Sequence, residues 1–304
     1  MSIWVLRGLR DGIVTTRWPQ GPDEYAQSWR GPVTVLPDAM PPDAVLPGTV
    51  LPERVPPETA LTETALPGAL PPDILAPDGA SVAALAGWAE LERLCPAGAI
   101  EVIGRPGAGQ LSVDQGRCVL CGRCVAARPD LFAWSRGATG PAAAALARQS
   151  LVVPAEPETD AAVAGVRAAL ARRTAALRRS VHIRHVDAGS DGSEEWEIQA
   201  LFGPVYDAQR LGVFLTASPR HADVLLVTGA GTVGMTGSLR ATYDGMPDPR
   251  VVIAVGTEAV SGGLLSDRLT GVDGAVPVDV WLPGSPPSPF GILNALLIAT
   301  GRLR

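Results

Sequence analysis

Short apolar runs that end at or near glycine dominate the C-terminal part of the chain. They are VHIRHVDAG from Val181, DVLLVTG from Asp223, RVVIAVG from Arg250 and PVDVWLPG from Pro277. Runs of this length, rich in β-branched residues and separated by longer connections, are typical of parallel strands that helices cover on both faces. We therefore predict an α/β domain over residues 181–304, with its turns gathered at the edge of the sheet where ligands usually bind.

The patterns change in the segments that precede this domain. Within residues 154–180, the run EPETDAAVAGVRAALARRTAALRR has an acidic start and a basic finish, which predicts a linker helix. Prolines recur throughout residues 37–79 and block helix interiors, so we expect an extended strap or linker there. Residues 1–36 are predicted to form an amphipathic arm, which could lie on a membrane surface, against a helix of a partner or against its own domain.

Composition narrows the classes of function. The chain has 304 residues, enough for two domains, and a formal net charge of −6. It lacks the basic field that nucleic acid requires, so we expect no nucleic-acid partner. It contains no run of eighteen apolar residues and no signal-peptide pattern, which favours the cytoplasm.

The four cysteines of the chain suggest a metal site. Cys118, Cys121 and Cys124 have C-x2-C-x2-C spacing, and Cys95 directly precedes a proline. In two-cluster ferredoxins, three ligands of one cluster come from such a loop and the fourth, followed by proline, comes from the other half of the fold. We predict one [4Fe-4S] cluster on these four residues, within a domain over residues 80–153. A structural zinc on the same thiolates is the alternative.

These segments carry resemblances to two families. GLRDGIVTTRWP and LSVDQGRCVLCGRCVAARPDLF are similar to the ferredoxin-like subunit of formate hydrogenlyase and complex I. LFGPVYDAQRLGV, ASPRHADVLLVTGAGT, VVIAVGTEAVSGG and VPVDVWLPGSPPSPFGIL resemble the B subunit of NADH-quinone oxidoreductase and the small subunit of energy-converting [NiFe] hydrogenases. The resemblance implies a fusion: an α+β ferredoxin-like domain over residues 80–153, and a flavodoxin-like parallel sheet covered by helices over residues 181–304.

The second family binds a proximal [4Fe-4S] cluster through cysteines in the glycine-ended turns. By the resemblance, those four positions are occupied here by Asp191, Glu194, Glu258 and Ser285. Cubanes prefer soft thiolates to hard carboxylates, so we expect no proximal cluster. Two interpretations of the resulting polar pocket remain. We favour a pocket without metal, because carboxylates gathered in this way need not converge; the other is a site for magnesium or calcium.

Three smaller patterns have both a structural and a functional interpretation. Gly229, Gly231 and Gly234 spell G-x-G-x-x-G after a strand, and we favour a tight turn over a nucleotide site. His182 and His185 are three apart on a predicted strand and would point to opposite faces, so we do not expect a metal pair. The resemblance gives Glu197 a role in proton transfer; a surface or interface role is the alternative.

Together these patterns predict an iron-sulfur electron-transfer subunit of a formate hydrogenlyase-like or complex I-like membrane-associated oxidoreductase. The expected partners are a hydrogenase-like or complex I-like large subunit and other subunits of a membrane-bound redox complex. The expected location is cytoplasmic and peripheral, on the inner face of the cell membrane. The alternative is a structural, assembly or redox-sensing subunit without electron relay to the large subunit. No catalytic residue can be named from the sequence.

Overall fold

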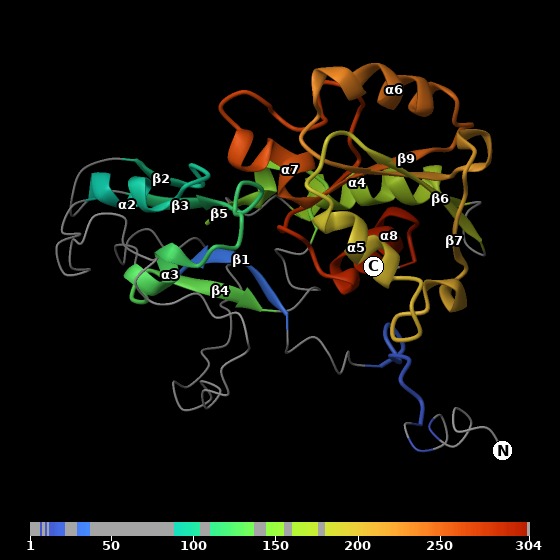
Figure 1. Cartoon of the computed structure of the whole chain (residues 1–304), viewed down its shortest axis with the longest axis horizontal. Coiled ribbons are helices and arrows are strands. Elements are labelled where there is room, and N and C mark those ends of the chain that lie inside the picture. The colour runs from blue at the N-terminus through green and yellow to red at the C-terminus, as the bar shows by residue number, and fades with distance from the viewer. Residues whose placement is uncertain are drawn as a thin grey trace.

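A computed structural model of the chain describes residues 7, 10, 12–21, 29–36, 88–103, 110–136, 144–154, 160–175 and 180–302. The proline-rich segment predicted over residues 37–79 lies outside these ranges. Figure 1 shows an α/β part formed by the C-terminal half of the chain and, beside it, a smaller part with antiparallel strands. The structure is therefore a mixed α/β fold.

The α/β part is built on a five-stranded sheet. Its strands are β6 (Val181–Asp187), β7 (Val213–Leu215), β8 (Val224–Thr228), β9 (Val251–Val255) and β10 (Val280–Leu282). All its pairings are parallel, in the order β10-β9-β8-β6-β7. Read from β7, this is the flavodoxin-like order in which the second strand precedes the first, third, fourth and fifth. The predicted parallel sheet is confirmed, and β7 is a fifth strand that the sequence pattern did not indicate.

Helices cover both faces of this sheet. Alternate residues of β8 and β9 belong to two separate cores, because successive side chains of a strand point to opposite faces. The first core includes residues of α5 (Ser193–Ala200) and α8 (Pro289–Ala299). The second includes residues of α6 (Val233–Asp244) and α7 (Gly256–Ser261). This two-sided cover explains why every residue of β8 and β9 is buried.

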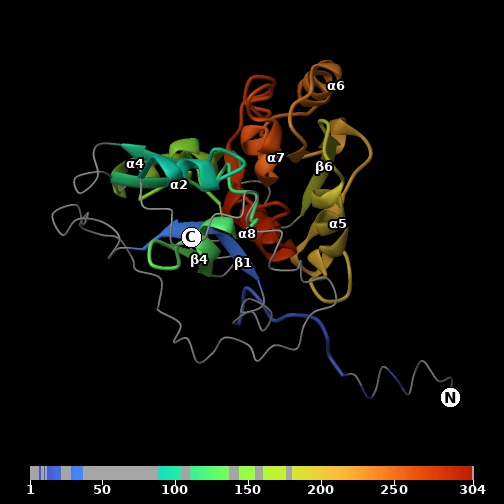
Figure 2. The same cartoon turned by 60° about the vertical axis from the view of Figure 1, so that its left-hand side comes forward.

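The smaller part is α+β. Strand β1 (Arg30–Val35) pairs antiparallel with β4 (Phe132–Arg136), and the two lie side by side in Figures 1 and 2. A second antiparallel sheet contains β2 (Ile100–Ile103), β3 (Gln110–Asp114) and β5 (Val152–Val153). Two short helices, α2 (Trp88–Leu94) and α3 (Arg123–Ala127), accompany them. The specific ferredoxin-like arrangement stays a prediction.

The described elements between and around these sheets complete the fold. Helix α4 (Asp160–Arg173) lies between the two parts in the sequence. The short helical turns are η7 (Arg148–Leu151), η9 (Ala208–Leu211), η10 (Pro219–His221) and η11 (Gly263–Leu265). Within the described ranges, no helix combines the length and the apolar character needed to cross a bilayer.

Residues 12–21 of the predicted arm pack on the α/β part of their own chain. The Thr16 amide donates to the Val205 carbonyl at 2.8 Å, and the Trp18 ring lies edge-on to Phe290 with centroids 4.5 Å apart. Trp18 is buried in the same core as α8. A few residues further on, β1 contributes Val33 to the core of the smaller part. The arm therefore connects both cores.

Replacing Trp18 by alanine tests this anchor. We expect Trp18→Ala to lower the free energy of unfolding by about 3–5 kcal/mol, because it leaves a cavity against Phe290. Urea denaturation followed by circular dichroism measures the change. Ile13→Ala is the matched control, since Ile13 is 88% exposed and should tolerate the truncation. Equal effects of the two substitutions would contradict the anchoring role of Trp18.

Candidate functional site: a cysteine group beside an acidic edge

The four cysteines come together in the smaller part of the fold. Cys95 follows α2, Cys118 and Cys121 lie in the loop before α3, and Cys124 is in the first turn of α3. The pKa of Cys124 is raised to about 12, mainly by burial and in smaller part by the charges of the other three thiols. Burial likewise raises the pKa of Cys118, with smaller contributions from Cys95 and Cys121. The sequence-predicted ligands thus lie close enough for their charges to interact.

Backbone amides are directed at these sulfurs. The Ala99 amide donates to Cys95 Sγ at 3.2 Å. Hydrogen bonds from the Val33 and Leu120 backbones lower the pKa of Cys118, against the larger effect of burial, and one from Val125 acts on Cys124 in the same way. Such bonds stabilise negative sulfur, and tune the potential of iron-sulfur clusters.

Gly122 lets the cysteine loop make its tight turn. Its φ is +74°, and a Cβ placed there would come within 2.8 Å of the Trp134 ring. An L-residue would be strained in this conformation and would also clash. The loop sequence therefore needs glycine between Cys121 and the start of α3.

The cysteine loop contacts the α/β part directly. The Thr257 hydroxyl, which is fully buried, donates to the Cys118 carbonyl at 3.0 Å and accepts from the Gly284 amide at 3.3 Å. Thr257 lies in α7, which in Figures 1 and 2 is on the side of the α/β part nearer α2. One hydroxyl thus joins the cysteine loop, α7 and the loop between β10 and α8.

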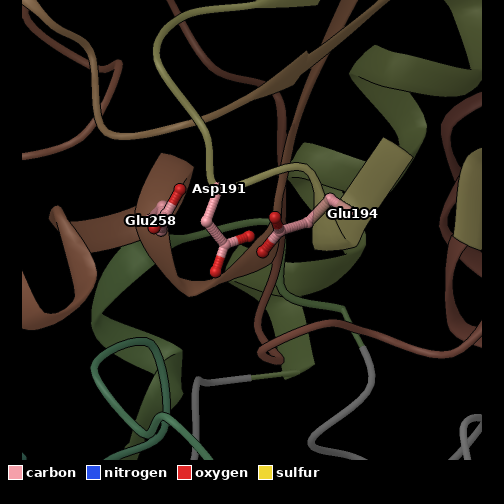
Figure 3. Close-up of side chains that lie close together, drawn as sticks. All are labelled: Asp191, Glu194 and Glu258. Atoms are coloured by element: carbon pink, nitrogen blue, oxygen red, sulfur yellow. The ribbon is translucent and has the colours of Figure 1, made fainter. Parts of the chain in front are cut away.

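Three carboxylates lie close together at the carboxyl edge of the sheet, and one of them, Glu258, directly follows Thr257 in α7. Asp191 lies in the turn after β6, Glu194 in the first turn of α5, and Glu258 in α7, after β9 (Figure 3). One carboxylate oxygen of each lies within 4.8 Å of the others. The structure thus brings together three of the four positions singled out in the sequence. Ser285, the fourth, lies half-buried in the loop after β10.

The acidic group is short of partners. Glu194 is fully buried, and its Oε1 has no hydrogen-bond partner; the same is true of the buried Oε2 of Glu258. The pKa of Glu194 is raised to about 7, mainly by burial and in smaller part by the charges of Glu258 and Asp191. Burial and the charge of Asp191 also raise the pKa of Glu258. Hydrogen bonds from Ser193 lower the pKa of Asp191, which favours its charged form.

A polar network next to this group was missed by the sequence analysis. His185 Nε2 lies 2.9 Å from Thr228 Oγ1, the Thr228 hydroxyl donates to Glu195, and the Ser190 hydroxyl donates to the other Glu195 oxygen at 3.0 Å. His182 instead stacks on Phe214. The two histidines therefore have different neighbours, as expected. The network joins β6, β8 and α5, so no local spacing could reveal it.

Crowding between turns explains the first two glycines of the G-x-G-x-x-G run, Gly229 and Gly231, whereas a Cβ at Gly234 would meet no atom within 4 Å. A Cβ at Gly229 would lie 2.5 Å from the backbone of Gly189 and Ser190. A Cβ at Gly231 would lie 2.3 Å from the Gly271 carbonyl oxygen. Close approach of three turns thus accounts for Gly229 and Gly231 as residues of tight turns.

Comparisons with known proteins relate the C-terminal part of the chain to a family. Residues 192–299 match the family described as NADH ubiquinone oxidoreductase, 20 Kd subunit. The probable membrane-bound hydrogenase subunit mbhJ of Pyrococcus furiosus is 40% identical over 130 residues, 42% of this chain and 78% of that protein. The chain belongs to the 20 kDa subunit family. The match lies within the half of the chain that carries the parallel sheet and the acidic group.

Two further relatives show the range of the 20 kDa subunit family. Formate hydrogenlyase subunit 7 of Escherichia coli (strain K12) is 37% identical over 154 residues, 50% of this chain and 59% of that protein. NAD(P)H-quinone oxidoreductase subunit K 1 of Acaryochloris marina is 41% identical over 105 residues, 33% of this chain and 45% of that protein. The chain therefore spans about half to three fifths of the length of these two relatives.

The buried Glu194 predicts a pH-dependent stability. Its pKa is about 7 in the folded chain against an ordinary 4.5, so the folded state binds the proton more tightly. The protonated Glu194 therefore contributes to the free energy of unfolding. This contribution is fully present below pH 4.5 and is lost as the pH rises through 7, and it amounts to about 3 kcal/mol. In chelator, we expect Glu194→Gln to lose markedly less stability than wild type between pH 5 and pH 8 in urea titrations. Asp244→Asn, at an exposed position, should behave like wild type; a Glu194→Gln profile identical to wild type would contradict the assignment.

The Thr257 hydroxyl provides a second test. We expect Thr257→Val to lower the free energy of unfolding by about 1–3 kcal/mol, because the buried Gly284 amide loses its acceptor. Thr257→Ser keeps the hydroxyl and serves as the control. Denaturant titration measures both, and a Thr257→Val variant as stable as Thr257→Ser would show that this contact contributes nothing.

Proposed function

We propose that the chain is an iron-sulfur electron-transfer subunit of a formate hydrogenlyase-like or complex I-like membrane-associated oxidoreductase. One [4Fe-4S] cluster would be held by Cys95, Cys118, Cys121 and Cys124. The observation that carries the proposal is the gathering of these four thiols, three of which (Cys95, Cys118 and Cys124) accept hydrogen bonds from the backbone. The relatives support the setting, since their names describe subunits of formate hydrogenlyase, a membrane-bound hydrogenase and a quinone oxidoreductase.

The donor set fits a cubane better than a single zinc ion. A tetrahedral zinc with Zn–S bonds of about 2.3 Å holds its sulfurs only about 3.8 Å apart. A cubane instead takes three thiolates from a C-x2-C-x2-C loop and a fourth from a cysteine followed by proline, which is the pattern of Cys118, Cys121, Cys124 and Cys95. This pattern supports the cluster over the zinc alternative.

The protein's own residues would control loading of this site. Burial keeps the thiols of Cys118 and Cys124 protonated, so metal binding must release protons. The amides of Ala99, Val33, Leu120 and Val125 then compensate the negative sulfurs. A cluster held there supplies one-electron transfer. The hydrogen bond from Thr257 of α7 to the Cys118 carbonyl would fix the position of the loop that holds the cluster.

The residues of the α/β part do not fit a second, proximal cluster. All four cysteines of the chain lie within residues 95–124, and the edge of the sheet offers Asp191, Glu194 and Glu258 instead. Hard carboxylates are poor ligands for a cubane. We therefore propose no electron transfer through Asp191, Glu194 and Glu258. This absence also favours the second candidate function, a structural, assembly or redox-sensing subunit that does not relay electrons to the large subunit.

The same edge suits a partner subunit. Large apolar side chains are exposed on three elements that follow β6, β8 and β9: Trp196 is 72% exposed on α5, Val233 88% on α6 and Leu264 64% on η11. Exposed apolar groups rimmed by polar residues mark protein interfaces. We propose that a hydrogenase-like or complex I-like large subunit docks here, and that the assembly holds the chain at the inner face of the cell membrane.

Electron paramagnetic resonance of the reduced, anaerobically reconstituted chain tests the proposal. We expect one signal of a [4Fe-4S] cluster, which disappears in Cys121→Ala because a thiolate ligand is lost. Leu264→Ala, which leaves the four thiols intact, should keep the signal. Zinc bound without sulfide, or a signal that survives in Cys121→Ala, would overturn the assignment. A cluster that forms but is not oxidised by the large subunit would favour the structural or sensing function.

A further inference from the structure

The acidic group at the carboxyl edge has an excess of buried negative charge. Glu194 is fully buried, and within the described ranges no arginine or lysine forms an ion pair with Asp191, Glu194 or Glu258. Asp187 and Glu195 add negative charge nearby, since their charges act on Glu258. A buried carboxylate without a counterion is costly, so it must bind either a proton or a cation.

Two orphaned oxygens indicate what the group lacks. Glu194 Oε2 accepts from the Ser193 hydroxyl at 3.1 Å, but Oε1 has no partner, and neither has Glu258 Oε2. In Figure 3 the carboxylate of Glu194 points toward that of Asp191. Buried carboxylate oxygens without a hydrogen-bond partner are the donors that a hard metal ion requires, and one oxygen of each residue lies within 4.8 Å of the others.

The backbone at Gly256 makes room for this arrangement. Its φ is +91°, and a Cβ there would come within 2.3 Å of Glu194 Oε1. Any larger residue at this position would displace the Glu194 carboxylate. The glycine at the start of α7 thus allows Glu194 to approach Glu258 from α5.

We propose that Asp191, Glu194 and Glu258 form a binding site for a divalent cation of the calcium type. The site takes the place that the family resemblance assigns to three cluster ligands, and it replaces soft ligands by hard ones. Bound there, the cation ties the turn after β6 to α5 and α7. The proposal does not depend on the cysteine site, because the two sets share no residue.

The spacing of the oxygens favours calcium over magnesium. Calcium with Ca–O distances of about 2.3–2.6 Å accepts ligand oxygens up to about 5 Å apart, whereas magnesium with about 2.1 Å limits them to about 4.2 Å. The three oxygens lie within 4.8 Å of one another. Calcium therefore fits the carboxylates as they stand, and magnesium would require them to move closer.

Calorimetric titration of the metal-stripped, full-length chain with calcium chloride tests the site. We expect one calcium per chain, with weaker binding of magnesium and a higher melting temperature when calcium is present. Glu194→Gln and Glu258→Gln should each weaken calcium binding about tenfold or more. Asp267→Asn removes one charge at an exposed position and should bind like wild type.

Three outcomes would overturn the proposal. Wild type that binds neither calcium, magnesium nor manganese would show that the group holds a proton instead. An equal loss of affinity in Glu194→Gln and Asp267→Asn would indicate only diffuse attraction by surface charge. Unchanged affinity in Glu258→Gln, with circular dichroism showing a folded variant, would exclude α7 from the site. Cys121→Ala should bind calcium normally, so failure of the cysteine assignment would not be mistaken for failure of this one.

Discussion

The structure depends on the tight packing of the turns that follow the parallel strands, at the carboxyl edge of the sheet. Parallel pairing brings the ends of β6, β8 and β9 together, and the turns approach so closely that Gly229 and Gly231 leave no room for a Cβ. The same crowding places the start of α7 against both the acidic group and the cysteine loop. Thr257 then fixes the loop by a buried hydrogen bond to the Cys118 carbonyl. Fold and candidate chemistry are therefore coupled at one edge.

This edge combines two kinds of ligand chemistry. The cysteine group offers soft sulfur donors supported by backbone amides, whereas Asp191, Glu194 and Glu258 offer hard oxygens. Thr257 and Glu258 are adjacent in α7, so the two groups are neighbours. Soft and hard donors select different metals, which allows two sites to lie close together without exchanging their ions. On this account, one site carries electrons and the other holds the edge together.

The sequence predicted the parts of the fold that local patterns specify. The β-branched runs from Val181, Asp223, Arg250 and Pro277 lead to strands because burial on both faces leaves an unmistakable apolar signal. Strand β7 was missed, because it is only three residues long at the edge of the sheet, with Phe214 and Leu215 partly exposed. Contacts between residues that lie far apart in the sequence could not be predicted from local patterns either. The bond from Thr257 to Cys118 spans 139 positions, and the His185 network joins separate strands. The family resemblance placed the acidic residues in one pocket, but the sequence analysis favoured a pocket without metal because carboxylates gathered in this way need not converge. In the structure one oxygen of each lies within 4.8 Å of the others.

The iron and acid-labile sulfide content of the anaerobically purified chain tests the central claim most directly. With all four cysteine thiolates in residues 95–124, the account predicts about four iron atoms and about four sulfides per chain, as one [4Fe-4S] cluster requires. About eight of each would mean that the carboxylate edge also holds a cubane. Zinc without sulfide would mean that the cysteines form a structural site and that the chain carries no electrons.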